Sequence, residues 1–260
     1  MAAATHAEGP TMTLVAENVF LMRGGNLVLE RISAALETGQ ITAICGPNGA
    51  GKSSLLMALA GLIKPSDGMV VLDSQRLENY TPQERAQRIG YLPQEAEVAW
   101  DVAVENLVRL GRMPYRDRGD HAVEAAIAAL DLEALRLRPA SQLSGGEKAR
   151  ALLARVLAGE PRWILADEPL AALDLAHQQT LLRHLRKAAE GGAGVVIVVH
   201  DLATAMNHAD RVIVLGQDED AGCVAADGAP EEALSVENIK RVWGVDARWI
   251  GESESMALIL

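Results

Sequence analysis

The chain has 260 residues, of which 49% are apolar, and a formal net charge of −11. This length fits one large domain or two small ones, and the apolar content is ample for a sizeable core, which excludes collagen-like and disordered proteins. The acidic charge and the few aromatic residues (one Phe, three Tyr and four Trp) argue against nucleic-acid binding through a basic face or a stacking platform.

Cysteine content and the first residues bear on location. Cys45 and Cys223 are too few for a disulfide framework and suit a reducing compartment. Residues 1–11 have neither a basic start nor an apolar stretch of signal-peptide length, so we expect a flexible tail there. The longest apolar run that resembles structure, residues 195–199, is far shorter than the roughly 20 residues that span a bilayer. These features predict a cytoplasmic protein.

The first part of the chain predicts strands around glycine-containing turns. Residues 13–21 and 27–36 predict two strands joined by the turn at 23–26. The other apolar runs of this part predict strands at 41–45, 69–72 and 89–92 and a helix at 52–62.

Between about residues 95 and 160 the strand signal fades, and the spacing of Ala and Leu predicts three helices. The expected helices lie at 102–110, 121–130 and 147–158. Strands at 163–166, 195–199 and 211–215 then alternate with helices at 175–189 and 202–208. This order predicts an α/β domain over 12–245 with a mostly parallel sheet covered on both faces, and an inserted helical subdomain. Residues 246–260 show no usable pattern and are expected to be a tail.

Residues 46–53, Gly-Pro-Asn-Gly-Ala-Gly-Lys-Ser, match the phosphate-loop pattern G-x-x-x-x-G-K-[ST]. Glycines let backbone N–H groups approach a phosphate closely, and the positive end of the following helix favours an anion. Lys52 is expected to reach the β- and γ-phosphates, and the Ser53 hydroxyl to bind Mg²⁺. The alternative is a glycine-rich turn without a ligand, but a predicted strand before it and a helix after it favour the phosphate loop.

Asp167 and Glu168 follow the predicted strand at 163–166. Neighbouring residues of an extended segment point in different directions, so the two acids can serve different purposes. Asp167 can hold Mg²⁺, directly or through water, and Glu168 can polarise the water that attacks the γ-phosphate. Alone, the pair could be the solvated end of a core strand; the phosphate loop favours the functional interpretation.

Residues 143–147, Leu-Ser-Gly-Gly-Glu, precede an apolar helical pattern. Ser144 and Glu147 predict a capping box at the start of that helix. Gly145 and Gly146 leave N–H groups accessible at its positive end, which makes a second anion-binding end. Either both helix ends serve one nucleotide, or each nucleotide lies between two copies of the chain.

Taken in chain order, these motifs together with Gln94, Asp174 and His200 resemble the ATP-binding subunit of an ABC transporter, over about residues 13–245. The resemblance implies an α/β P-loop NTPase with a RecA-like core, N-terminal antiparallel strands and a helical subdomain inserted at about 95–160. It also implies an ATPase with ATP and Mg²⁺ as cofactors.

The resemblance further implies roles for individual residues. Gln94, Glu168 and His200 would be catalytic, and Ser53, Gln94 and Asp167 would hold Mg²⁺. The expected contacts with ATP in the same chain are Arg23, Asn48, Gly49, Gly51, Lys52, Ser53 and Ser54. The expected contacts with ATP held by a second copy are Ser144, Gly145, Gly146, Glu147 and Asp174. Arg23 stands where the family usually has an aromatic residue under the adenine, so the way the base is held stays open.

Partners implied by the resemblance are a second copy of the chain and transmembrane permease subunits, at the cytoplasmic face of the inner membrane. A periplasmic or extracellular binding protein would act only indirectly, and no nucleic acid is expected. The segment at 108–115, with Leu-Gly-Arg-Met-Pro, resembles importers of iron-siderophores, haem or cobalamin and is expected where the permease docks. Alternatives are an ABC ATPase for another cargo, a soluble ABC ATPase without transport, and a regulator that binds ATP but barely hydrolyses it.

Overall fold

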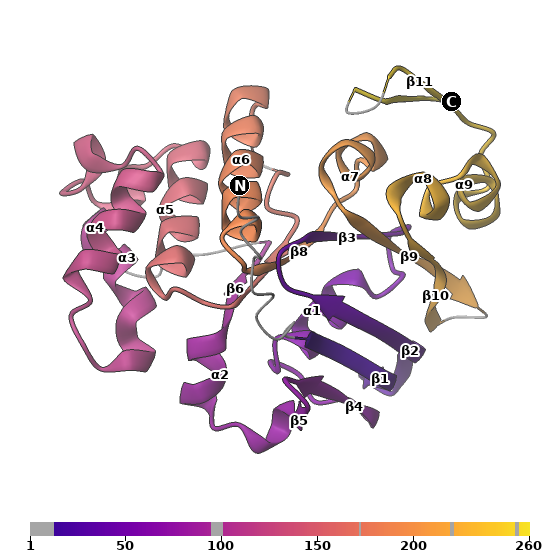
Figure 1. Ribbon diagram of the computed structural model, residues 1–260, viewed down its shortest axis with the longest axis horizontal. Coiled ribbons are helices and arrows are strands. Elements are labelled where there is room, and N and C mark those ends of the chain that lie inside the picture. Colours follow the sequence, from indigo (N-terminus) through magenta and orange to yellow (C-terminus); the bar gives the residue numbers. More distant parts are fainter. Residues whose placement is uncertain (1–12, 95–100, 172, 219–220, 253–254) are drawn as a thin grey trace, which may run out of the picture.

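The computed structural model describes residues 13–94, 101–171, 173–218, 221–252 and 255–260. The strands of its main sheet are β1 (Thr13–Arg23), β2 (Asn26–Glu37), β3 (Ile41–Cys45), β4 (Asp67–Leu72), β5 (Gln75–Arg76), β6 (Ile89–Leu92), β7 (Trp163–Asp167), β8 (Gly194–Val198), β9 (Arg211–Asp218) and β10 (Ala221–Gly228). They form one ten-stranded sheet in the order β5-β4-β1-β2-β10-β9-β3-β8-β7-β6 (Figure 1).

The sheet has a parallel part and an antiparallel part. Every neighbouring pair in the run from β6 through β7, β8 and β3 to β9 is parallel. The pairs of β1 with β2 and β4, and of β9 with β10, are antiparallel. Because parallel strands end at the same edge, the segments that follow β3, β6, β7 and β8 meet there, which is where ligands bind in such sheets.

The described helices surround this sheet. They are α1 (Lys52–Leu59), α2 (Pro82–Arg88), α3 (Val104–Arg109), α4 (Asp120–Ala129), α5 (Gly145–Ala158), α6 (Leu175–Glu190), α7 (Leu202–His208), α8 (Pro230–Ala233) and α9 (Val236–Trp243), with 3₁₀ turns η1 (Leu77–Asn79), η2 (Leu110–Tyr115), η3 (Glu133–Leu135) and η4 (Ala140–Gln142). Helices α3, α4 and α5 stand together on the far side of α6 from the antiparallel strands (Figure 1). They match the expected helical insertion.

Strands β3, β7 and β8 are each buried along their whole length. Their sequences are apolar apart from Thr42 in β3 and Asp167 at the end of β7, and a parallel strand covered by helices on both faces has no solvent side. One buried cluster joins the parallel strands to α3–α6, and a second joins the antiparallel strands to α1. The α/β fold with a helical insertion is therefore confirmed.

Several elements were not predicted. Helix α2 begins with a capping box between Thr81 and Glu84 and has Pro82 in its first turn, a signal that the sequence carries. Residues 246–260, expected to be a tail, include the antiparallel strands β11 (Arg248–Ile250) and β12 (Ala257–Ile259). The amide of Asn207 in α7 holds the backbone of Met256 through two hydrogen bonds of 2.7 and 2.8 Å. The expected tail at 1–11 lies outside the described residues.

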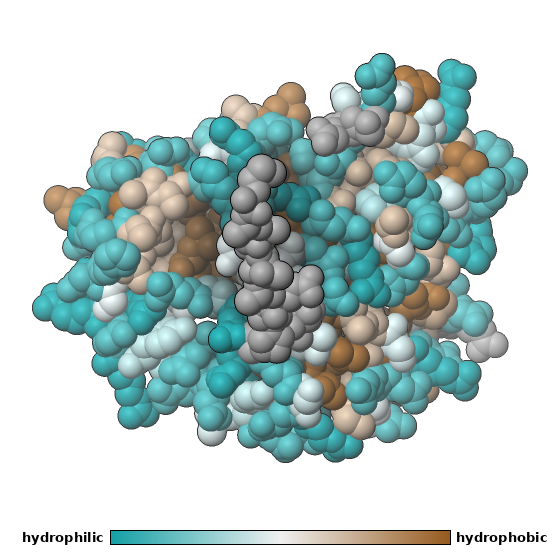
Figure 2. All heavy atoms as spheres, in the orientation of Figure 1, coloured by the Kyte–Doolittle hydropathy of each residue, from teal (hydrophilic) through white to brown (hydrophobic). Residues whose placement is uncertain are grey.

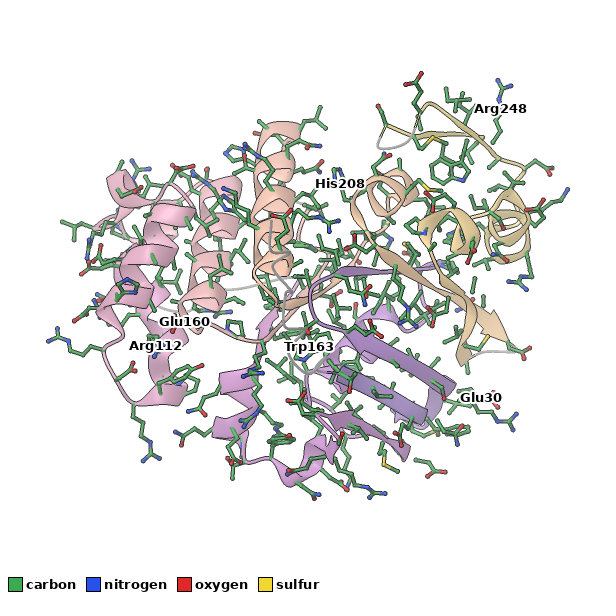
Figure 3. All side chains as sticks on the ribbon, in the orientation of Figure 1. Glu30, Arg112, Glu160, Trp163, His208 and Arg248 are labelled. Carbon is green, nitrogen blue, oxygen red and sulfur yellow. The ribbon has the colours of Figure 1, made fainter. Side chains whose placement is uncertain are left out.

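The Leu-Gly-Arg-Met-Pro segment forms η2, and its arginine is buried. Arg112, 6% exposed, donates to both carboxylate oxygens of Asp117 (3.0 and 2.7 Å), to Glu160 (2.8 Å) and to the Ala158 carbonyl (3.2 Å). Its guanidinium also stacks on the ring of Tyr115, 3.9 Å from the ring centre. Figure 3 places Arg112 and Glu160 together where the helical insertion ends. The arginine thus closes the C-terminal end of α5.

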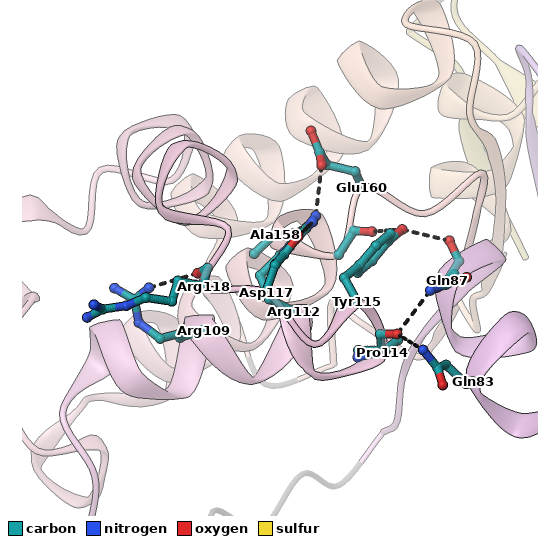
Figure 4. Close-up of polar contacts among 11 residues, drawn as sticks. Gln83, Gln87, Arg109, Arg112, Pro114, Tyr115, Asp117, Arg118, Ala158 and Glu160 are labelled. Atoms are coloured by element: carbon teal, nitrogen blue, oxygen red, sulfur yellow. Dashed lines mark hydrogen bonds and ion pairs between the residues drawn. The ribbon is translucent and has the colours of Figure 1, made fainter.

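Pro114 and Tyr115, the last two residues of η2, reach α2 (Figure 4). The Pro114 carbonyl accepts hydrogen bonds from the side-chain amides of Gln83 (2.6 Å) and Gln87 (2.9 Å). The Tyr115 hydroxyl lies 2.8 Å from the Gly159 carbonyl and 3.1 Å from that of Gln87. We call the set Arg112, Pro114 and Tyr115 the η2 latch, because it ties the end of α5 to α2. Met113, within the same turn, is 70% exposed.

The described surface is largely hydrophilic on the face drawn in Figure 2. Among the described helices, none combines the length and the apolar character that crossing a bilayer requires.

Candidate nucleotide-binding site

The loop after β3 has a shape that two of its glycines make possible. Gly46 has φ +151°, and a Cβ there would lie 2.4 Å from the Leu215 carbonyl oxygen of β9. Gly51 has φ +83°, and a Cβ there would lie 2.4 Å from a methyl carbon of Leu29. Side chains are strained at these φ values and have no room here. The glycines therefore allow the loop to pass close to β2 and β9 before α1 begins at Lys52.

A cleft of about 540 Å³ opens at this loop, within the range of small-ligand sites. Its lining is Arg23, Val28, Asn48, Gly49, Gly51, Lys52, Ser53, Ser54, Glu168 and His200. All the residues expected to contact ATP in the same chain line it, including Arg23 at the end of β1. Val28 was not predicted; it is an apolar residue of a strand that gives no sign of a ligand.

Lys52 lies inside the loop rather than in solvent. Its Nζ donates to the carbonyls of Gly46 and Pro47, each at 2.9 Å, and the residue is only 6% exposed. Burial lowers the pKa of this amine, and the negative charge of Glu168 opposes the shift. A buried cation held by neutral carbonyls favours an anion in the cleft, because burial of an unpaired charge is costly.

Asp167, at the end of β7, is buried beside the phosphate loop. Its Oδ1 accepts a hydrogen bond of 3.0 Å from the Ser53 hydroxyl. Burial raises the pKa of Asp167, and the Ser53 hydrogen bond opposes the shift. Tyr91 in β6, which was not predicted, interacts with Asp167; burial and then that carboxylate raise the pKa of Tyr91 to about 12. Nothing local in the sequence links residues on two separate strands.

The oxygen atoms of Ser53 and Asp167 suit Mg²⁺, which usually takes one or two carboxylates together with substrate phosphates. The described residues contain no group of three or more His, Cys, Asp or Glu side chains that could hold a metal. A Mg²⁺ ion here would take the oxygens of Ser53 and Asp167 together with phosphate oxygens or water.

The Glu168 carboxylate contacts two of the other predicted side chains, Gln94 and His200. Its Oε2 accepts a hydrogen bond of 2.7 Å from the Gln94 amide, and its Oε1 lies 2.5 Å from His200 Nε2. Glu168 has φ +48°, a conformation that is costly for a residue with a Cβ and that is found at functional sites. Its side chain is 12% exposed. A carboxylate held from both sides at the edge of a phosphate-sized cleft can accept a proton from water.

The other predicted group lies elsewhere. Ser144 caps α5, and the predicted capping box with Glu147 is confirmed by hydrogen bonds of 3.3 and 2.8 Å. Asp174 caps α6 by accepting from the His177 N–H at 2.9 Å. None of Ser144, Gly145, Gly146, Glu147 and Asp174, all of them described, lines the cleft of their own chain. Sequence reasoning missed His177, which contacts both Asp174 and Gly146.

Comparisons with known proteins agree with this geometry. The family model described as ABC transporter matches residues 29–171, more than half of the chain. The hemin import ATP-binding protein HmuV of Rhodococcus jostii is 44% identical over 238 residues, which cover 90% of this chain and 80% of that protein. The protein of the same name from Pseudomonas aeruginosa is 41% identical over 238 residues, covering 88% and 92%.

Solved structures show the same fold. CbiO1 of Clostridium perfringens, part of the CbiONQ ABC transporter complex, is 27% identical with a TM-score of 0.74, covering 88% of this chain and 92% of that one. An inward-facing ABC transporter assigned to the metal-chelate type is 27% identical with a TM-score of 0.77, covering 95% and 96%. The phosphate loop, the acids that follow β7 and these matches lead to one conclusion: the chain belongs to the ABC transporter family, as an ATP-binding subunit with ATPase activity.

Proposed function

We propose that this chain is the ATPase of an importer of haem or a related metal chelate, and that it works as a homodimer beneath a membrane permease. The convergence of Gln94 and His200 on Glu168, at the edge of the phosphate-loop cleft, supports the hydrolytic part. The cargo is proposed from the names of the relatives, several of which are called hemin import ATP-binding proteins. The Leu-Gly-Arg-Met-Pro segment favours the same class of importer.

The phosphate loop would bind the triphosphate of ATP. Its backbone N–H groups and Lys52 would contact the phosphates, while Arg23 would stack on the adenine through its planar guanidinium. Mg²⁺, held by Ser53, Asp167 and Gln94 together with phosphate oxygens, would neutralise charge on the β- and γ-phosphates. Ser53 and Asp167 are already 3.0 Å apart, so little rearrangement is needed on this side of the site.

Glu168 would accept a proton from the attacking water. Gln94 and His200 hold the two carboxylate oxygens from opposite sides, which fixes the orientation of the carboxylate before ATP arrives. Such a prearranged base lowers the barrier because no reorganisation is needed during the reaction.

The second copy would complete the site. The N-terminal end of α5 carries free N–H groups at Gly145 and Gly146 but does not line the cleft of its own chain. In a head-to-tail dimer, that end would contact the γ-phosphate bound by the partner, and Asp174 would lie at the seam. Hydrolysis would remove the bridging charge, and the opening of the dimer would be transmitted to the permease.

The dimer is tested with Glu168→Gln, which keeps the shape of the side chain but removes the base. In size-exclusion chromatography with ATP and Mg²⁺, we expect this variant to elute as a dimer and to have lost turnover. The matched control, Glu168→Gln combined with Lys52→Ala, should stay monomeric because it cannot bind the phosphates. A Glu168→Gln protein that stays monomeric at saturating ATP would contradict the proposed dimer with ATP bound between its two copies.

The cargo is tested in cells that depend on this chain for uptake. Cells with Glu168→Gln should lose haem uptake, while cells with Glu133→Gln, an exposed acid of η3, should keep it. Retained haem uptake together with loss of cobalamin or iron-siderophore uptake would change the cargo but leave the importer. If no transport is lost and no permease co-purifies from membranes, the soluble ATPase becomes the better interpretation.

A further inference from the structure

His177 occupies a position between two of the sequence motifs. It lies in the first turn of α6, and its backbone N–H donates to Asp174 Oδ1 at 2.9 Å. The same carboxylate oxygen lies 2.8 Å from His177 Nδ1. Because a carboxylate only accepts hydrogen bonds, this contact places the ring hydrogen on Nδ1. These two hydrogen bonds lower the pKa of Asp174, so the carboxylate is ionised at neutral pH.

The other side of the imidazole rests against the start of α5. A Cβ added to Gly146 would lie 3.1 Å from His177 Cγ and Cδ2 and 3.2 Å from Nδ1. Three ring atoms at nearly equal distances mean that the ring lies flat over the Gly146 backbone. The absence of a side chain at Gly146 lets the imidazole come this close.

This contact adds a link between the N-terminal turns of two helices that already share one buried cluster. Helix α5 packs with α3 and α4 in the helical insertion and on β6 at the edge of the sheet, whereas α6 packs on β8 and β3 of the core. The imidazole therefore links the anion-binding end of the insertion to an acid fixed on the core. A shift of α5 relative to the sheet would have to move Gly146 across this ring.

We propose that His177 is a positioning residue for the first residues of α5 and their cap, Ser144–Gly146, which we call the Ser144 corner. It sets the angle at which this corner faces the nucleotide held by a second copy. The inference rests on the proposed dimer. His177 orients the N–H groups of α5 through Gly146, and Asp174 fixes the ring through Nδ1. A corner free to tilt would meet the γ-phosphate less often in the right geometry, so both dimerisation and hydrolysis would need more ATP.

The test uses the Glu168→Gln protein, in which the ATP-bound dimer accumulates. Adding His177→Ala should raise the ATP concentration at half-maximal dimerisation by about tenfold, the order of effect of one lost hydrogen bond to a charged group. ATP binding to the single chain, measured with a fluorescent analogue at low protein concentration, should not change. His177→Gln, which can still donate to Asp174, should recover part of the loss. The matched control is His184→Ala, two turns further along α6.

The outcomes separate the two ideas. If Glu168→Gln itself does not dimerise, the proposed ATP-bound dimer and the proposed role of His177 are both wrong. If Glu168→Gln dimerises and His177→Ala leaves the ATP requirement unchanged, only the role of His177 fails. If His177→Ala lowers the melting temperature but does not raise the ATP requirement above that of His184→Ala, the histidine only stabilises the first turn of α6 and the inference is overturned.

Discussion

The N-terminal ends of α1 and α5 are both suited to anions, but they are finished in different ways. Helix α1 follows Gly51, and no described side chain caps it. Helix α5 begins with a reciprocal capping box between Ser144 and Glu147. The first end leaves its N–H groups to a ligand, beside a buried Lys52 whose amine donates to two backbone carbonyls. The second is stable by itself and presents only the donors that remain.

This difference teaches which end a single chain can use alone. The α1 end lies in the cleft that Glu168 and His200 also line, so we expect it to bind the phosphates of its own nucleotide. The α5 end does not line that cleft, and in the proposed dimer the partner would bring the anion. Changes at α1 should therefore affect binding by the single chain, and changes at α5 should affect only the assembled pair.

The largest effect is expected from exchanging one glycine at each end. Gly46→Ala should abolish ATP binding, because its Cβ would lie 2.4 Å from a backbone carbonyl, and should destabilise the fold by about 2–4 kcal/mol. Gly146→Ala should bind ATP normally in the single chain but lose hydrolysis and dimerisation. Titration with a fluorescent ATP analogue and an ATPase assay separate the two; equal loss of binding in both variants would remove the distinction between the ends.

The next largest effect concerns the pair of side chains on Glu168. Gln94→Ala and His200→Ala should each slow hydrolysis by about 10²-fold, and the double variant should lose less than the product because both act on one carboxylate. ATP affinity should change much less than the rate, because Lys52 and the phosphate-loop N–H groups, which supply most of the expected phosphate contacts, remain in place. Single-turnover rates give the comparison, with His121→Ala as the control. Fully multiplicative losses would mean that the two side chains act independently.

A smaller effect is expected at the other end of α5. Arg112→Ala should lower the free energy of unfolding by about 2 kcal/mol, because a buried guanidinium with several partners is removed. Arg112→Lys should rescue little, since an ammonium cannot bind Asp117 through two parallel hydrogen bonds. Urea unfolding measures the loss, and the ATP affinity of the single chain should be unaffected. A change in ATP affinity would show that the two helix ends are not independent of the η2 latch.

The smallest effect belongs to the cap of α5. Hydrogen bonds from Ser144 lower the pKa of Glu147, so its stabilising effect is complete above its unfolded pKa and is lost as pH falls through the lower folded value. Glu147→Gln should therefore lower the melting temperature at pH 7 and differ less from the unmodified protein at pH 4. Thermal unfolding at the two pH values measures this. Lys148→Gln, one residue further along the helix, should show no such convergence.

Local pattern was sufficient for the parallel strands and for the phosphate loop. Strands such as β3 and β8 are short and almost wholly apolar, so the sequence locates them to within a residue. Strand β10 was missed: it pairs antiparallel with its neighbour β9, but its other edge depends on a distant partner, since Gly222 pairs with Leu29 of β2 and a Cβ there would lie 2.1 Å from the Ala50 carbonyl. No local periodicity carries that information.

The site shows the same division. Lys52, Ser53 and Glu168 are found from neighbours in the sequence, because their chemistry depends on a strand end followed by a loop. Tyr91 on Asp167 and His177 on Gly146 join segments far apart in the chain. The segment 108–115 was interpreted from its resemblance to importers as a contact for the permease, but Arg112 within it is buried. Only the folded structure separates the buried residue from its exposed neighbour Met113.

The η2 latch gives α5 a pivot. A helix of this length is a stiff rod of roughly 20 Å, and Arg112 anchors one end while the Ser144 corner forms the other. A force on the Ser144 corner therefore acts as a torque about the anchored end. The charge-assisted hydrogen bonds of Arg112 resist this torque more strongly than the neutral amide hydrogen bonds to the Pro114 carbonyl. The hydrogen bonds from Gln83 and Gln87 to Pro114 should therefore break first. Helix α2 would then move relative to α5, while Arg112 still holds the C-terminal end of α5.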